Sequence, residues 1–142
     1  MVPSSLQKPF RKAGLFEGRQ VAVDAAVPTR HPARTVLAEL GSIAWLRPST
    51  NVCSMEFLHV SENASSMAAW EAALGTTMVG IAEQDDGHGE LYMTQGGVVV
   101  FCSIVDPACG FVGRPLPRLW KSLDAVSEFD RCCFLINGGV TL

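Results

Sequence analysis

The sequence predicts an α+β fold: a mixed, largely antiparallel sheet with about four helices packed on it, in a single domain of residues 1–142. Three observations predict this class. Residues 90–94 alternate between apolar and polar types, as in a strand with one buried face. After a Gln-Gly-Gly turn, residues 98–102 are apolar on both faces, which predicts an antiparallel hairpin whose second strand lies inside the sheet. Stretches with the apolar spacing of helices separate the β-rich runs.

Size and composition favour one folded core. The chain has 142 residues, of which 48% are hydrophobic and 18% charged, so it is not a disordered polypeptide. A net charge of -3 gives no basic footprint for nucleic acid. The chain has neither an 18-residue apolar run nor the apolar stretch of a secretory signal near its start, so we expect cytoplasmic residence and no membrane contact. The five cysteines form no CxxC pair and are expected to be buried free thiols.

Apolar residues at spacings of three and four predict four helices. Pro9 is expected to limit how early the first helix begins, because proline lacks a backbone N–H group. Glycines are expected to end the first three helices, and the first of these, Gly14, can adopt a left-handed conformation. In chain order, the predicted helices have the buried residues Leu6, Phe10 and Ala13, ending at Gly14; Ala33, Val36, Leu37 and Leu40, between Pro32 and Gly41; Met67, Trp70 and Leu74, from Ser61 or Asn63 to Gly75; and Leu119, Trp120, Leu123 and Val126, from Pro117.

Further β-rich runs predict the remaining strands. Residues 43–46 and 52–58 are expected to pair as a hairpin, and residues 106–110 are expected to form a loop. Strands are predicted over residues 20–23, 43–46, 52–58, 76–81, 90–94 and 98–102, with a further apolar run at 132–136 that can complete the sheet or pair with another chain.

The motif that comes nearest to enzyme chemistry is an incomplete zinc deaminase signature, H-x-E…P-C-x-x-C. His88 and Glu90 match its first half, but Cys109 follows Pro107 by two positions instead of one. Val112 stands where the second cysteine ligand is required, and a catalytic zinc needs three protein ligands. A zinc-dependent nucleobase deaminase-like protein therefore stays an alternative. The sequence predicts no catalytic residue, no metal ligand and no cofactor.

Acidic residues gather between two predicted strands. Asp85 and Asp86, followed by Glu90, form either a solvated loop or a binding surface for a basic partner. Tyr92 shares the face of Glu90 in the predicted strand, and Trp120 is an aromatic residue of the kind enriched at interfaces. These five are the predicted partner-binding residues.

Several short motifs in a fixed order resemble the SUKH superfamily. They are AGLFEGR at residues 13–19, HPA…VLAELG at 31–41, LGT at 74–76 with VG at 79–80, and DGHGELYM at 86–93. The third SUKH subgroup, which contains immunity proteins of bacterial polymorphic toxin systems, is the most similar. The resemblance covers about residues 6–126, and residues 127–142 form an extension without an assigned counterpart. Leu15 and Ser42 depart from the usual aromatic residue and glycine.

The resemblance implies a function in protein binding. Members of the family have an α+β fold and neutralise a cognate toxin domain, often a nuclease or nucleic-acid deaminase, by stoichiometric occlusion. It therefore implies that the chain is not an enzyme, and that its partner is a toxin, expected to be basic, with no direct contact to nucleic acid or membrane. A regulatory scaffold module without a toxin is a further alternative.

Overall fold

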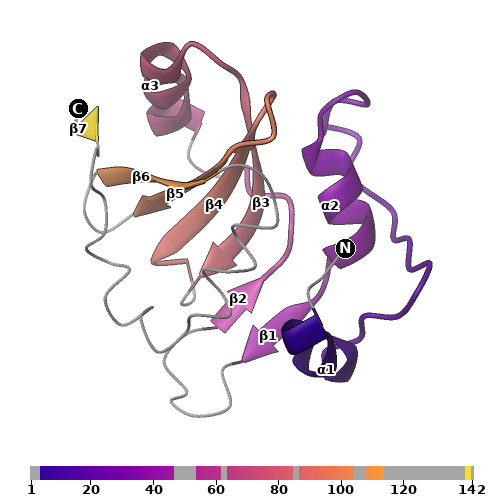
Figure 1. Cartoon of the computed structure of the whole chain (residues 1–142). Helices are drawn as coiled ribbons and strands as arrows, with labels where there is room; N and C mark the ends of the chain where they lie inside the picture. The colour runs from indigo at the N-terminus through magenta and orange to yellow at the C-terminus, as the bar shows by residue number, and fades with distance from the viewer. Residues whose placement is uncertain are drawn as a thin grey trace.

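The computed structural model describes residues 4–46, 54–61, 64–84, 87–103, 108–113 and 140–141. Seven strands form one sheet whose spatial order follows the chain, and each described pair is antiparallel (Figure 1). The strands are β1 (Ala44–Leu46), β2 (Ser54–Glu56), β3 (Met78–Gln84), β4 (Gly89–Thr94), β5 (Val99–Ser103), β6 (Ala108–Gly113) and β7 (Val140–Thr141), and the described helices are α1 (Ser4–Lys12), α2 (Ala33–Leu40) and α3 (Ala64–Leu74). The predicted α+β class is confirmed.

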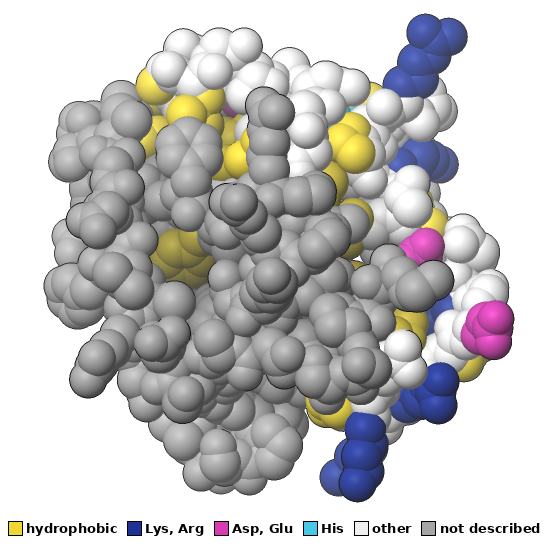
Figure 2. Space-filling view, in the orientation of Figure 1, with side chains coloured by type: hydrophobic (Ala, Val, Ile, Leu, Met, Phe, Trp, Pro, Cys, Tyr) yellow, Lys and Arg dark blue, Asp and Glu magenta, His cyan; other side chains and the backbone are white. Residues whose placement is uncertain are grey.

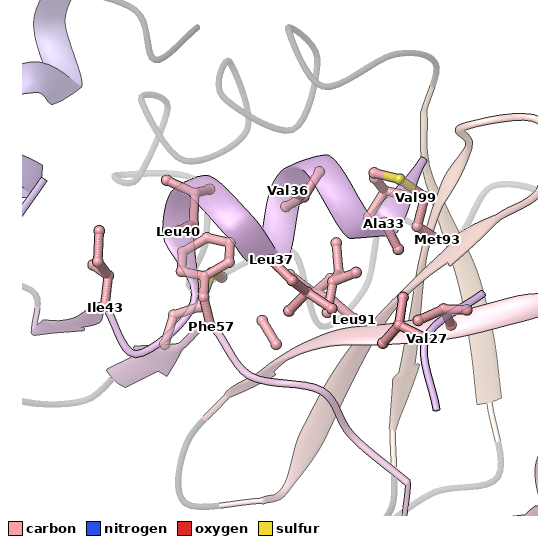
Figure 3. Close-up of a cluster of buried hydrophobic side chains, with 14 of the residues drawn as sticks. Val27, Ala33, Val36, Leu37, Leu40, Ile43, Phe57, Leu91, Met93 and Val99 are labelled. Carbon is pink, nitrogen blue, oxygen red and sulfur yellow. The ribbon is translucent and has the colours of Figure 1, made fainter. Parts of the chain in front are cut away.

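Helices cover both faces of the sheet. The apolar stripe of α2 packs with Leu91, Met93 and Val99 in the larger core (Figure 3). Side chains of β4 alternate between faces, so Tyr92 points the other way, into a smaller cluster with Trp70 of α3. The predicted hairpin of β4 and β5 is confirmed, and β5 lies inside the sheet as expected. Both faces of β4 are buried, however, because α3 covers the side on which its polar residues lie.

Most helix predictions are confirmed, including the buried stripe of α2 and the glycines at the ends of α1 and α3. Gly14 and Gly75 have φ angles of 105° and 63°, in the left-handed region. The expected effect of Pro9 is wrong, because α1 begins at Ser4 and contains Pro9. The missing N–H of one proline removes a single helical hydrogen bond, and the neighbouring Phe10 is fully buried in the larger core.

The predicted strand at residues 20–23 is also wrong, because this segment runs beside α2 instead of joining the sheet. The Val21 N–H donates to the Ala38 carbonyl at 2.9 Å. The Arg19 guanidinium donates to the carbonyls of Glu39 and Gly41, both at 2.6 Å. The last carbonyls of a helix have no partner within it, so Arg19 closes the end of α2.

Replacing Arg19 with alanine should lower the free energy of unfolding by about 1–2 kcal/mol, since two charge-assisted hydrogen bonds at a partly buried site are lost. Urea-induced unfolding measures the change. The exposed Arg30 provides the control, because Arg30→Ala removes the same charge without these contacts. Equal unfolding midpoints for the two variants would contradict this role of Arg19.

Other strand boundaries differ from the prediction. β3 starts at Met78 and continues to Gln84, further than expected. Residues 108–110, predicted as loop, belong to β6, where pairing with β5 supplies their backbone hydrogen bonds. The predicted helix from Pro117 and the apolar run 132–136 lie outside the described residues. Across the part of the chain that the structure describes, each helix is too short or too polar to cross a membrane.

Candidate partner-binding surface

Three glutamates stand side by side across neighbouring strands. Glu56 of β2 is opposite Glu83 of β3, which is in turn opposite Glu90 of β4. Directly opposed residues of antiparallel strands point to the same face, here the face that α3 packs on. Like charges that are directly opposed on neighbouring strands disfavour the sheet. We call these three residues the glutamate row and treat it as the candidate surface.

The row runs from solvent into the protein. Glu56 is exposed and Glu83 is half-buried, whereas Glu90 is only 4% exposed. The Tyr92 hydroxyl, itself on a side chain 3% exposed, donates a hydrogen bond to a Glu90 carboxylate oxygen. The expectation that β4 has only one buried face is therefore wrong, because the face that carries Glu90 and Tyr92 is buried as well. Their contact holds the inner end of the row in place, and Glu56 presents its outer end.

The other predicted residues fall outside this description. Asp85, Asp86 and Trp120 lie outside the described residues. Gln84 ends β3 just before the acidic pair, and Gly87 follows it with a φ of 87°. In the sequence, the acidic pair thus lies between the strands that carry Glu83 and Glu90.

Acidic and basic residues are also separated along the chain. This separation is visible in the sequence as a whole but not in any short motif. Residues 48–113 contain no lysine or arginine but eight acidic residues: Glu56, Glu62, Glu71, Glu83, Asp85, Asp86, Glu90 and Asp106. In contrast, Lys8, Arg11 and Lys12 are exposed on α1. In Figure 2 the Lys and Arg side chains that are drawn lie on the α1 and α2 side of the molecule. The strands that carry the glutamate row thus come from a purely acidic segment.

The two halves of the incomplete deaminase signature lie on different strands. His88 is exposed just before β4, and Cys109 belongs to β6. Because β5 lies between these strands, the two positions are roughly 10 Å apart across the sheet. Among the described residues, no group of three His, Cys, Asp or Glu side chains is arranged to hold a metal ion.

The cysteine side chain that the structure describes does not indicate a reactive or metal-binding site either. Cys102 is a buried free thiol, as predicted, and sits in the cluster beneath α3. The side chains of the other four cysteines lie outside the described part.

No protein-family model, no characterised protein and no solved structure matches this chain.

Proposed function

We propose that this chain is a cytoplasmic immunity protein of the SUKH type, which binds a bacterial toxin domain with a basic surface and neutralises it by stoichiometric occlusion. The observation that most supports this proposal is the glutamate row, which is built across three strands from a segment without a single lysine or arginine. The resemblance of residues 6–126 to that family supplies the kind of partner.

The geometry suits recognition of a surface that normally holds nucleic acid. A nuclease or nucleic-acid deaminase needs lysines and arginines to bind phosphates. Carboxylates on adjacent strands repeat at about 4.8 Å, so the exposed Glu56 and the half-buried Glu83 offer closely spaced negative charges in place of the phosphate backbone. The exposed Glu56 would steer association, while Glu90, held by Tyr92, keeps the inner end of the row in place.

The alternatives make different predictions. A zinc-dependent deaminase-like protein should contain about one zinc per purified chain, which metal analysis measures directly. A regulatory scaffold would bind a protein other than a toxin. Co-expression with candidate toxin domains separates the two binding roles, because only an immunity protein restores growth to cells that express its cognate toxin.

Replacing Glu56 with lysine should slow association with the toxin about tenfold at low salt and flatten the dependence of the association rate on salt. Folding should be retained, because Glu56 is exposed and the change removes a like-charge pair with Glu83. Stopped-flow binding at two salt concentrations measures the effect. Glu17→Lys is the matched control, since Glu17 is equally exposed but precedes the acidic segment. Equal slowing by both variants would mean that net charge, and not the glutamate row, governs binding.

A further inference from the structure

A cavity of about 410 Å³ lies between α3, β3 and the segments that precede α2 and follow β2. Its volume is within the range of roughly 300–1,000 Å³ that is usual for small-molecule sites. Its wall contains both apolar and polar side chains. The lining residues that the argument uses are His31, Met67, Glu71, Met78, Gly80 and Tyr92.

His31 brings a poorly satisfied hydrogen-bond donor to the wall of this cavity. The Ala33 N–H donates to Nδ1 of His31 at 3.2 Å, so the neutral ring carries its proton on Nε2. Burial lowers the pKa of His31, and the nearby Thr77 carbonyl opposes this only in part, so the ring is neutral at neutral pH. The side chain is 3% exposed, and Nε2 makes no hydrogen bond of ordinary geometry among the described residues, with the Thr77 carbonyl as a poorly aligned partner.

An unpaired buried N–H is unfavourable, and structures normally satisfy it. Nε2 of His31 has almost no accessible surface in the structure. The same wall contains Met67 and Met78, whose unbranched side chains adapt their shape readily. A molecule in the cavity can therefore reach Nε2 through side-chain rotation, without a change in the backbone.

A hydrogen-bond acceptor, Glu71 of α3, also lines the cavity. One of its carboxylate oxygens, Oε1, accepts the Met78 N–H at 2.7 Å, which fixes the side chain against β3. A carboxylate can accept further hydrogen bonds from a ligand. The cavity therefore combines a donor from His31 with an acceptor from Glu71.

The charges around the cavity disfavour an anion. Among its described lining residues there is no lysine or arginine. His59 also lines it, and its Nδ1 pairs with the Asp24 carboxylate at 2.9 Å. The Ala26 N–H and His59 lower the pKa of Asp24, so this carboxylate stays charged. Together with Glu71, it gives the surroundings a negative character that repels phosphates and carboxylates.

We propose that this cavity binds a small, neutral, planar molecule that carries both a hydrogen-bond acceptor and an N–H donor, such as a nucleobase or an aromatic carboxamide. The acceptor meets Nε2–H of His31, and the donor meets Glu71. The ring lies against Met67 and Met78, since thioethers make favourable contacts with aromatic rings. This binding activity goes beyond toxin neutralisation. Tyr92 lines the cavity and also bonds to Glu90, so the ligand lies next to the inner end of the glutamate row.

Titration of the full chain with nicotinamide, followed by NMR, tests the proposal. Saturable shifts are expected for the His31 side-chain nitrogens and for the methyl groups of Met67 and Met78. His31→Phe keeps a ring but removes the donor, and should weaken binding about tenfold. The matched control is His88→Phe, which alters an exposed histidine outside the cavity and should bind like the wild type.

Two further probes test the chemistry of the site on the wild-type chain. Benzoate, which replaces the carboxamide with a carboxylate, and toluene, which has no polar group, should each bind about tenfold more weakly than nicotinamide. Absence of saturable shifts at His31 up to the solubility limit of nicotinamide would overturn the proposal, as would equal binding of toluene. These measurements do not depend on the folding of a variant. They are also independent of growth rescue by toxin neutralisation, so the two proposals can fail separately.

Discussion

Replacing Phe57 with alanine is expected to lower the free energy of unfolding by about 3–5 kcal/mol. Phe57 follows β2 and is 0% exposed, and its ring lies 6.0 Å from that of Phe10 on α1, measured between centroids. Its backbone N–H and carbonyl bond to Ile43 and Ser42, so the main chain cannot easily move to fill the cavity that the substitution leaves. Figure 3 shows the Phe57 ring beside Leu40 of α2.

Urea-induced unfolding of Phe57→Ala measures this loss. Phe16→Ala is the matched control, because Phe16 is the same residue type but 64% exposed, and its removal should change stability by no more than about 0.5 kcal/mol. A similar loss of stability in both variants would contradict the special contribution of the buried Phe57 ring, which packs against Phe10 of α1.

Gly80→Ala is the second substitution with a large expected effect, a loss of about 1–3 kcal/mol or more. An added Cβ would lie 2.6 Å from both the Cβ and the carbonyl oxygen of Val60. Because one of these atoms is backbone, rotation of a side chain cannot relieve the clash. The strand is also irregular here, since the β3–β4 register shifts between Gly80 and Ala82.

Thermal unfolding of Gly80→Ala, compared with Gly96→Ala, tests this prediction. A Cβ at Gly96 would meet only the Thr94 hydroxyl, at an ordinary 3.8 Å, so this variant should melt close to the wild type. If the two variants melt at the same temperature, the segment around Val60 moves aside freely. Gly80 and Val60 both line the cavity, so a destabilised but folded Gly80→Ala chain should also bind nicotinamide more weakly.

Local periodicity explains what the sequence predicted well. The stripe of α2 and the alternation along β4 follow from residues within a few positions of each other, and both are confirmed. The strand predicted at residues 20–23 was wrong because a short β-prone run does not reveal that its backbone hydrogen bonds to the end of a helix. The predicted effect of Pro9 on the start of the first helix was wrong because the burial of Phe10 outweighs the loss of one helical hydrogen bond.

The candidate sites depend on contacts that local patterns do not contain. Glu56 and Glu83 become neighbours only through the register between β2 and β3, with α3 intervening in the chain. Alternation placed Glu90 and Tyr92 on one face correctly, but their burial depends on what packs against that face. The wall of the cavity comes from five separate segments of the chain, so the sequence around His31 or Glu71 alone does not predict it.

The agreement between strand order and chain order has a consequence for how the protein forms. From β3 to β6 each strand pairs with the next one along the chain, so each pairing closes only a short loop and costs little chain entropy. Proteins dominated by such sequence-local contacts fold quickly, and synthesis delivers these strands in the order in which they pair. The long connections are those from β2 to β3, which contains α3, and from Gly113 of β6 to Val140 of β7. The strands that carry the glutamate row can therefore assemble before the end of the chain has been synthesised.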